Sequence, residues 1–250
     1  MNRDLLLTII TITKDDSVGV SRTLASTEAW RNEVWVEQVV VDASAMPTAM
    51  RDERIRVIRQ NSTGISGAFN EGLAHVRGKW VWFLNGGDEI DAKLEPVFLR
   101  KILEATRADA LIGGITYEGE NEPQPHPPAI MQWPTLLSWV PHPSTLVRYN
   151  LFERFGFFDV KYTIVMDYDF WMRAFTSPGV AVDVTSIPFS IFAAGGVSQR
   201  SDCRDRLTGE LDNVIRSHQG VLWRIWLAAG FRLLRASRRA FCRRVLRRFF

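Results

Sequence analysis

The residues best suited to chemistry lie between Gly64 and Asp88, where a helix that opens on a glycine is followed by a strand that ends near a carboxylate. Apolar residues recur at helical spacing up to Gly78, and the continuous apolar run at 80–84 is typical of a strand buried on both faces of a sheet. Loops at the carboxyl ends of parallel strands can converge on a phosphate or a metal. The order of these features suits a site for a metal-bound nucleotide, although Asn-Gly-Gly-Asp is also ordinary turn chemistry.

The elements that must position these residues alternate between strands and helices. The sequence predicts strands at 5–13, 38–42, 54–59, 80–84, 109–116 and 144–148, and helices at 17–29, 64–77, 94–106 and from 149 onward. This alternation is the βαβ pattern of an α/β fold with a mostly parallel sheet. The proline-rich stretch at 117–134 is predicted to be a loop, either a mobile active-site element or an inert surface excursion, followed by a short helix around Leu136.

Length and composition bound the class of protein. A chain of 250 residues, 46% hydrophobic and 24% charged, can bury one sizeable core and carry an appendage. Cys203 and Cys242 have no partners at zinc-site spacing and cannot build a disulfide framework, which favours a reducing compartment. The apolar run from Leu5 to Ile12 is too short and too polar for a signal peptide or a membrane span.

The carboxyl-terminal tail differs from the rest in charge. Residues 221–250 contain nine arginines and no acidic residue, so a net charge of +3 leaves −6 on the first 220 residues. As one helix, 222–250 would carry an apolar stripe opposite clustered arginines, which is typical of a helix lying on an anionic membrane surface. A helix packed on the main domain and a nucleic-acid-binding arm are the alternatives. We favour the membrane interpretation and expect no nucleic-acid partner.

Six motifs in order resemble those of the family 2 inverting glycosyltransferases, most closely the bacterial colanic-acid and other exopolysaccharide enzymes. They are Thr8-Ile-Ile-Thr-Ile-Thr13, Val39-Val-Val-Asp42, Gly64-Ile-Ser with Asn70-Glu-Gly72, Phe83-Leu-Asn-Gly-Gly-Asp88, His142-Pro-Ser-Thr with 151–159, and Asp167-Tyr-Asp169. The resemblance implies a GT-A fold, that is, a Rossmann-like, mostly parallel central sheet flanked by helices. It implies a catalytic domain at 1–200, which a connecting helix at 201–220 joins to the amphipathic helix at 221–250.

The resemblance also implies chemical roles for two carboxylates. Asp88 would hold Mg²⁺ or Mn²⁺ between the two donor phosphates, where the ion assists departure of the nucleoside diphosphate. Asp167 would be the general base that takes the proton of the acceptor hydroxyl, which leads to inversion. Asp169 is the competing base, and capping of the following helix is the alternative role for Asp167.

A second implied set of residues binds the nucleotide. Asp42 would accept hydrogen bonds from base or ribose, or else cap the following turn, because an ionised carboxylate is a pure acceptor. Ser66 is alternatively the N-cap of its helix, and His142 contacts phosphate or metal or is structural. The predicted set is Thr11, Asp16, Asp42, Gly64, Ser66, Asn70 and Asn85.

The chain departs from the family pattern at several positions. The family often has a second acidic residue at the position of Asn85 or of Gly87, and an aspartate at the position of Gly67. The absence of these acids predicts weak metal affinity. The expected partners are a nucleotide-sugar donor, a lipid-linked saccharide acceptor and an anionic membrane surface, on the inner face of the cell membrane, where the protein would be cytoplasmic and peripheral. The rival classes are a nucleotidyltransferase on the same fold and a degenerate domain that binds nucleotide or partner proteins without turnover.

Overall fold

The computed structural model describes residues 5–47, 50, 52–120, 122–123, 140–175, 177–196 and 201–218. The chain divides into two compact units, Met1–Ala194 and Gly195–Phe250. The first unit contains the sheet and its flanking helices. In the second, the described part is a short 3-10 helix, η5 (Ser201–Cys203), followed by α7 (Arg204–His218).

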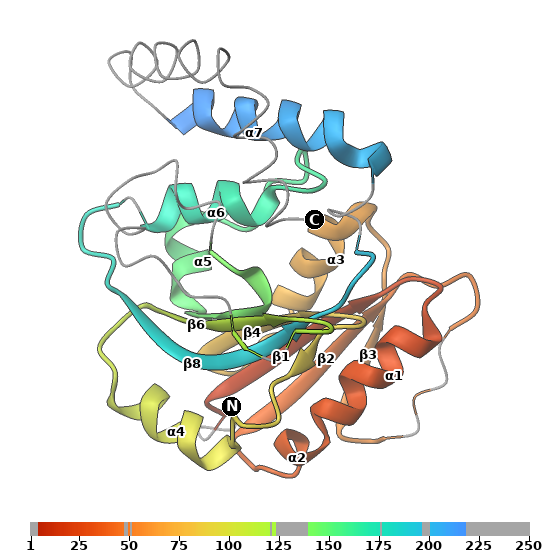
Figure 1. Cartoon of the computed structure of the whole chain (residues 1–250), viewed down its shortest axis with the longest axis vertical. Helices are drawn as coiled ribbons and strands as arrows, with labels where there is room; N and C mark the ends of the chain where they lie inside the picture. The colour runs from red at the N-terminus through yellow and green to blue at the C-terminus, as the bar shows by residue number, and fades with distance from the viewer. Residues whose placement is uncertain are drawn as a thin grey trace. The chain divides into compact units, whose positions relative to one another are not determined.

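The first unit is built on one eight-stranded sheet (Figure 1). Its strands are β1 (Leu7–Thr13), β2 (Val36–Asp42), β3 (Ile55–Arg59), β4 (Trp80–Asn85), β5 (Glu89–Ile90), β6 (Ala110–Tyr117), β7 (Thr145–Arg148) and β8 (Val182–Phe192), in the spatial order β3-β2-β1-β4-β7-β6-β8-β5. Strands β3, β2, β1 and β4 are mutually parallel, and β8 is parallel to β6. Strand β7 runs antiparallel to both β4 and β6, and β5 runs antiparallel to β8.

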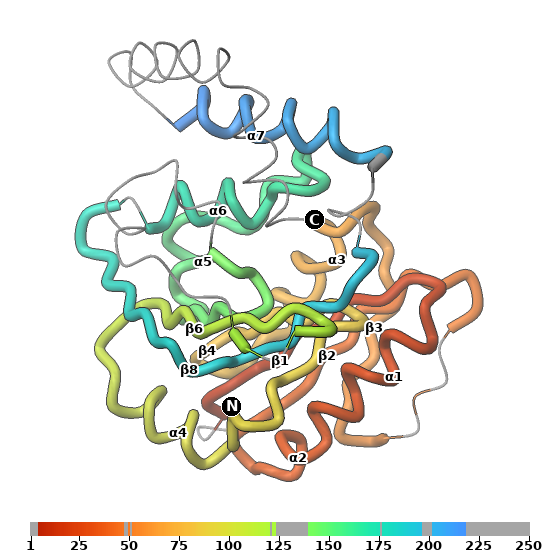
Figure 2. Tube along the Cα trace, viewed as in Figure 1, coloured from red at the N-terminus to blue at the C-terminus, as the bar shows by residue number. Residues whose placement is uncertain are grey.

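Helices cover both faces of this sheet, as the chain traces in Figures 1 and 2 show. On one face lie α1 (Ser17–Ser26), α2 (Glu28–Arg31) and α4 (Pro96–Ala105), and on the other lie α3 (Gly64–Leu73), α5 (Asn150–Phe155) and α6 (Met166–Phe175). A single turn of 3-10 helix, η3 (His142–Ser144), leads into β7.

The core is divided between the two faces by the alternation of side chains along each strand. From β4, Trp80, Trp82 and Leu84 join the cluster that includes Trp30 of α2 and Leu99 of α4. Phe83 points to the opposite face, where it packs edge-on against Phe69 of α3 and Phe152 of α5. Both faces of β4 are therefore apolar, which explains the uninterrupted hydrophobic run in the sequence.

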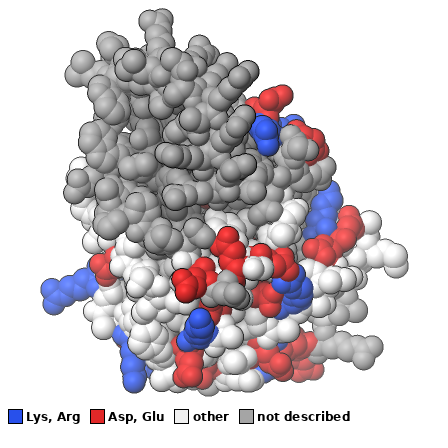
Figure 3. All heavy atoms as spheres, in the orientation of Figure 1, with Lys and Arg blue, Asp and Glu red and all other residues white. Residues whose placement is uncertain are grey.

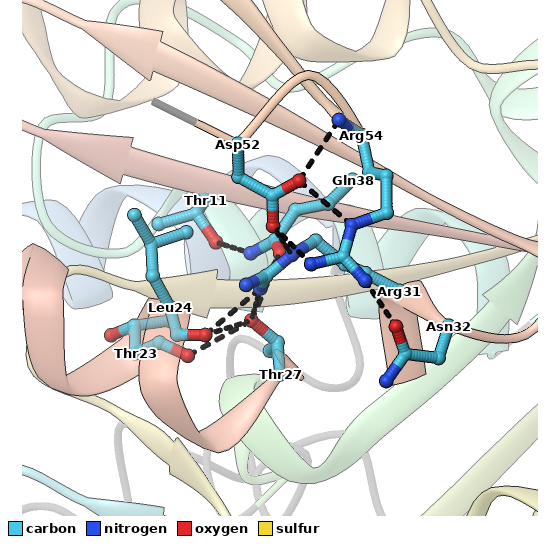
Figure 4. A network of polar contacts seen from close by, with 9 residues as sticks. All are labelled: Thr11, Thr23, Leu24, Thr27, Arg31, Asn32, Gln38, Asp52 and Arg54. Atoms are coloured by element: carbon cyan, nitrogen blue, oxygen red, sulfur yellow. Dashed lines mark hydrogen bonds and ion pairs between the residues drawn. The ribbon is translucent and has the colours of Figure 1, made fainter. Parts of the chain in front are cut away.

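A buried arginine ties α1 and α2 to the sheet (Figure 4). The Arg31 side chain is 5% exposed and donates through Nη1 to Thr27 Oγ1 at 2.6 Å and to Gln38 Oε1 at 2.9 Å, and through Nε to Asp52 Oδ2 at 2.9 Å. Gln38 Nε2 in turn donates to Thr11 Oγ1 at 3.1 Å. Because a buried guanidinium needs an acceptor for each donor, this network fixes β1, β2 and the connection before β3 in one arrangement.

The α/β class and the predicted strands are confirmed. The helix expected at 17–29 is two helices, since α1 ends at Ser26 and α2 begins at Glu28. The helix expected around Leu136, most of the loop at 117–134 and the amphipathic helix at 221–250 lie outside the described residues, and the domain boundaries at 200 and 220 stay predictions.

Candidate active site

Asp88 lies just beyond β4, in a tight turn whose Gly87 has a φ of +107°. Its side chain is buried, with Oδ1 accepting from the backbone N–H of Ala193 at 3.0 Å and Oδ2 accepting from the backbone N–H of Asn85 at 3.2 Å and its Nδ2 at 3.1 Å. Burial raises the pKa of Asp88 to about 7 despite these hydrogen bonds. A carboxyl group in this state gains most from a cation beside it.

The donor set around Asp88 fits a magnesium-type ion that is shared with substrate phosphates. Mg²⁺ is usually held by one or two carboxylates together with phosphate oxygens and water. Asp88 supplies one carboxylate, and the described residues contain no group of three or more His, Cys, Asp or Glu that could hold a metal alone. A side chain at position 87 would strain the backbone, whose φ is +107°, and would meet Ala193 Cβ at 3.1 Å, so a second acid there would be disfavoured.

Three further charged side chains surround this turn. Arg22 of α1 forms ion pairs with Glu89 and, at 2.8 Å, with Glu118. The other carboxylate oxygen of Glu118 accepts from the backbone N–H of Ala194 at 2.9 Å. Asp88 and Glu118 thus hold consecutive backbone amides at the end of the first unit.

Asp167 is the second residue of α6, so it is not the N-cap of that helix. Its side chain keeps 24% of its surface exposed, and Oδ1 accepts from the backbone N–H of Tyr168 at 2.7 Å. Desolvation raises the pKa of Asp167 to about 6. A carboxyl group in this range is ionised at neutral pH, yet is a stronger base than an ordinary aspartate, which suits proton abstraction from a hydroxyl.

Asp169, the competing base, is occupied by structural contacts. Its side chain is 4% exposed and accepts from Arg173 Nε at 2.9 Å, one helical turn later. Arg173 also donates to the backbone carbonyls of Phe155, Gly156 and Phe157. This ion pair secures the segment before α6 and leaves Asp167 as the accessible carboxylate of the two.

His142 lies beside Asp167, in η3. The imidazole is 8% exposed and stacks on Phe83 with ring centroids 5.0 Å apart. Its Nδ1 is 3.9 Å from Asp167 Oδ2. Burial lowers the pKa of His142 to about 3, so the ring is neutral.

The predicted nucleotide residues at the ends of β1 and β2 lie at one edge of the sheet. Asp42 is buried and accepts from the backbone N–H of Ser44 at 2.8 Å, as in the turn-capping alternative. Asp16 caps α1 by accepting from the N–H of Gly19 at 2.8 Å. Asp15 joins the two loops, because its N–H donates to Ser44 Oγ at 2.8 Å.

Three of the predicted nucleotide contacts are engaged elsewhere. Thr11 is fully buried, and its hydroxyl accepts from Gln38 in the Arg31 network. Ser66 is not an N-cap, because the N-cap of α3 is Thr63, and its hydroxyl donates to the carbonyl of Tyr162. Asn70 exchanges two hydrogen bonds with the backbone of Phe158, at 2.9 and 3.0 Å.

Two glycines at the start of α3 differ in the room around them. Gly64 opens the helix with a φ of +77° and has no heavy atom within 4 Å of a built Cβ, so its backbone stays open to a ligand. At Gly67 a Cβ would lie 2.4 Å from Ser62 Oγ, so an acid there would require Ser62 to move.

Sequence reasoning missed the cluster of Arg22, Glu89 and Glu118, for which no spacing signal exists because its members come from α1, β5 and the end of β6. It also missed Arg173, although the spacing of four residues from Asp169 on a helix was a usable signal.

The fold, a mostly parallel sheet covered by helices on both faces, is of the GT-A type. Residues 9–176 match glycosyl transferase family 2, and the chain belongs to that family.

Two curated relatives, both described as uncharacterized glycosyltransferases of Mycobacterium tuberculosis, are 24% identical over 191 residues, covering 67% of this chain and 68% of each relative. Among solved structures, S. aureus TarS superposes with a TM-score of 0.60 at 17% identity, covering 76% of this chain and 37% of TarS. A TarS structure in complex with UDP-GlcNAc gives 0.59 at 15% identity, covering 85% of this chain and 65% of that one. In the first of these comparisons, the match covers little more than a third of the TarS chain.

Proposed function

We propose that the protein transfers a sugar from a nucleotide-sugar donor to an acceptor hydroxyl, with inversion at the anomeric carbon. The observation that carries this proposal is the division of labour between two neighbouring carboxylates. Asp169 is buried and paired with Arg173, whereas Asp167 is reachable and has a raised pKa. In a family 2 glycosyltransferase, a reachable carboxylate of this kind supports the role of general base.

A uridine nucleotide is the first donor to consider, because the TarS structures were solved with UDP and with UDP-GlcNAc. In this chain Asp16, Asp42 and Gly64 would bind the nucleoside part at the ends of β1 and β2 and the start of α3. Asp88, with Asn85 bonded to it, would hold Mg²⁺ or Mn²⁺ against the diphosphate. Such an ion supplies charge neutralisation for the leaving nucleoside diphosphate.

Asp167 performs the proton transfer in this proposal. One of its carboxylate oxygens is fixed by the N–H of Tyr168, which leaves Oδ2 to accept the proton of the acceptor hydroxyl. The hydroxyl oxygen of the acceptor then attacks the anomeric carbon from the side opposite the nucleotide. The bond to the nucleoside diphosphate breaks, and the configuration at the anomeric carbon inverts.

We further propose a lipid-linked saccharide acceptor in exopolysaccharide or related surface-glycan synthesis, reached from the inner face of the cell membrane. The basis is the arginine-rich tail at 221–250. Within the described chain, no helix is long and apolar enough to cross a membrane. The described part of the face in Figure 3 carries acidic side chains with lysines and arginines set among them. Residues 1–220 carry a net charge of −6, so attraction to anionic lipid would come from the nine arginines of the tail.

The test is to incubate the full chain with Mn²⁺ and a panel of nucleotide sugars that begins with UDP-GlcNAc, and to identify the released product. Nucleoside diphosphate supports a glycosyltransferase, and an α-linked donor should yield a β-linked product by NMR. Pyrophosphate would instead support the nucleotidyltransferase. Absence of turnover together with nucleotide binding would support the degenerate binding domain, which Asn85 and Gly67 favour. Asp159→Asn, at a partly exposed carboxylate near the same segment, is the matched control for Asp167→Asn.

A further inference from the structure

His142 is a buried polar side chain without hydrogen bonds in the part of the chain that the structure describes. Both ring nitrogens, Nδ1 and Nε2, lack a partner. An unsatisfied buried donor is costly, and the few that native proteins keep often serve a catalytic function. The ring is nevertheless held firmly, because four aromatic side chains surround it: Phe69, Phe83, Phe158 and Trp171.

Oδ2 of Asp167 lies 3.9 Å from Nδ1 of His142. That separation exceeds a hydrogen bond by about 1 Å. The carboxylate can close the gap by turning about its χ2 bond, a torsion with broad minima. The imidazole cannot move to meet it, because the stacked Phe83 and the edge of Phe69 confine it.

We propose that His142 is a positioning residue for Asp167, donating a hydrogen bond from Nδ1–H to Oδ2 in the substrate-bound enzyme. This inference rests on the proposed role of Asp167 as the general base. With Tyr168 N–H on Oδ1 and His142 Nδ1–H on Oδ2, both carboxylate oxygens are held. The remaining lone pair of Oδ2 then points in one direction, toward the acceptor hydroxyl.

The neutral state of His142 is part of this function. A neutral imidazole has one N–H, so it can orient the carboxylate without neutralising it, whereas an imidazolium at this distance would weaken the base. The aromatic surroundings favour the neutral form by excluding water. Those surroundings therefore set both the place and the charge of the ring.

The test compares His142→Phe with the unchanged protein and crosses it with Asp167→Asn. Phenylalanine keeps the aromatic packing and removes both nitrogens, so stability against urea should be unchanged or higher. UDP release from UDP-GlcNAc with Mn²⁺, with water as acceptor, should fall about 10- to 100-fold in kcat, the effect of one hydrogen bond to an ionised group. The KM for UDP-GlcNAc should stay within about twofold, because the proposed contact orients the base and not the donor.

The double variant separates positioning from packing. If His142 acts through Asp167, the substitution at 142 should change the residual rate of Asp167→Asn by less than about threefold. An equal loss in both backgrounds would overturn the inference, as would a His142→Phe enzyme with unchanged kcat. If the unchanged protein releases no nucleoside diphosphate from any donor, the proposed function itself fails, which is a different outcome.

A spectroscopic measurement gives a second readout. Long-range ¹H–¹⁵N correlation at pH 8, with UDP and diamagnetic Mg²⁺ bound, reports which ring nitrogen carries the proton. The signals of His142 are those that His142→Phe removes, which distinguishes them from the signals of the other three histidines. The Nδ1–H tautomer is expected, and a ring protonated on Nε2 alone would overturn the assignment.

Discussion

Replacing Asp88 with asparagine should stabilise the metal-free protein at pH 8 while abolishing its response to divalent cations. The pKa of Asp88 is raised from 3.8 to about 7 by burial, so the folded state binds a proton that the unfolded state releases. A group with a raised pKa in the folded state stabilises it at low pH, and this contribution is lost as pH rises through the folded pKa. The ionised carboxylate is therefore a burden on the fold above about pH 7.

The size of this burden follows from the two pKa values. One pKa unit corresponds to 1.36 kcal/mol. The raised pKa of Asp88 therefore lowers the free energy of unfolding by about 2 kcal/mol at pH 5 and by about 4 kcal/mol at pH 8, relative to a side chain with the same pKa in both states. An asparagine side chain does not ionise and therefore lacks this cost. Its amide N–H₂ would instead face another donor, the backbone N–H of Asn85, and the lost hydrogen bond would cost about 1–3 kcal/mol at any pH. The free energy of unfolding of Asp88→Asn relative to the unchanged protein should thus rise by about 2–3 kcal/mol between pH 5 and pH 8.

The assay is urea denaturation of both proteins at pH 5, 6, 7 and 8 in the presence of a chelator. Glu104→Gln, at an exposed carboxylate of α4 paired with Arg100, controls for the loss of one charge. Adding Mn²⁺ with UDP should then raise the midpoint of the unchanged protein and leave that of Asp88→Asn in place. A difference between the two proteins that is the same at every pH would refute the argument from burial.

Three further predictions follow from the site and the tail. Asp167→Asn should lower kcat about 10²–10⁴-fold with UDP binding unchanged. If Asp169→Asn lowers kcat more than Asp167→Asn does, Asp169 is the general base and the assignment is wrong. Because the pKa of Asp167 is raised to about 6 by burial, kcat/KM should rise with pH and reach half its plateau near pH 6, provided stability is constant over the range; a profile flat from pH 5 to 8 would contradict this. Residues 221–250 should bring the protein down with vesicles of anionic lipid at low salt, and equal binding to neutral vesicles, or none, would contradict the electrostatic argument.

The sequence was sufficient for the sheet because its strands are marked by local patterns. The run from Trp80 to Leu84 is apolar on both sides, and it ends in a turn that requires a glycine at position 87. A buried parallel strand followed by a carboxylate can be recognised without knowing its neighbours. Asp88 was placed correctly at the strand end for that reason.

The roles of polar side chains could not be predicted in the same way, because their partners are remote in the sequence. Ser66 contacts Tyr162, and Asn70 contacts Phe158. The side chain of Thr11 points into the core, where it contacts Gln38. Successive side chains of a strand point to opposite faces of the sheet, but this alternation alone does not say which face meets a ligand. Polar residues on a helix or strand near a site are equally suited to a ligand and to the protein backbone until the tertiary contacts are known.

The choice between Asp167 and Asp169 shows the same limit at close range. The two residues are separated by one position and have the same side chain, yet Arg173 pairs with one and not with the other. The deciding quantity is exposure, 24% for Asp167 against 4% for Asp169, and exposure is a property of the packed structure.

The segment that precedes the proposed base is held by polar contacts to its main chain and by two buried aromatic side chains, Phe158 and Tyr162. Ser66 and Asn70 bind the backbone of Tyr162 and Phe158, and Arg173 binds the carbonyls of 155–157. These polar contacts do not depend on side chains of the segment, apart from a proline at 158, which would remove a donor. The buried rings of Phe158 and Tyr162 do depend on their residue types. Exposed positions such as Val160 and Lys161 are therefore free to vary during evolution while Asp167 stays where it is. A segment anchored through its backbone and two buried rings would let related enzymes change its exposed side chains without rebuilding the site that performs the reaction.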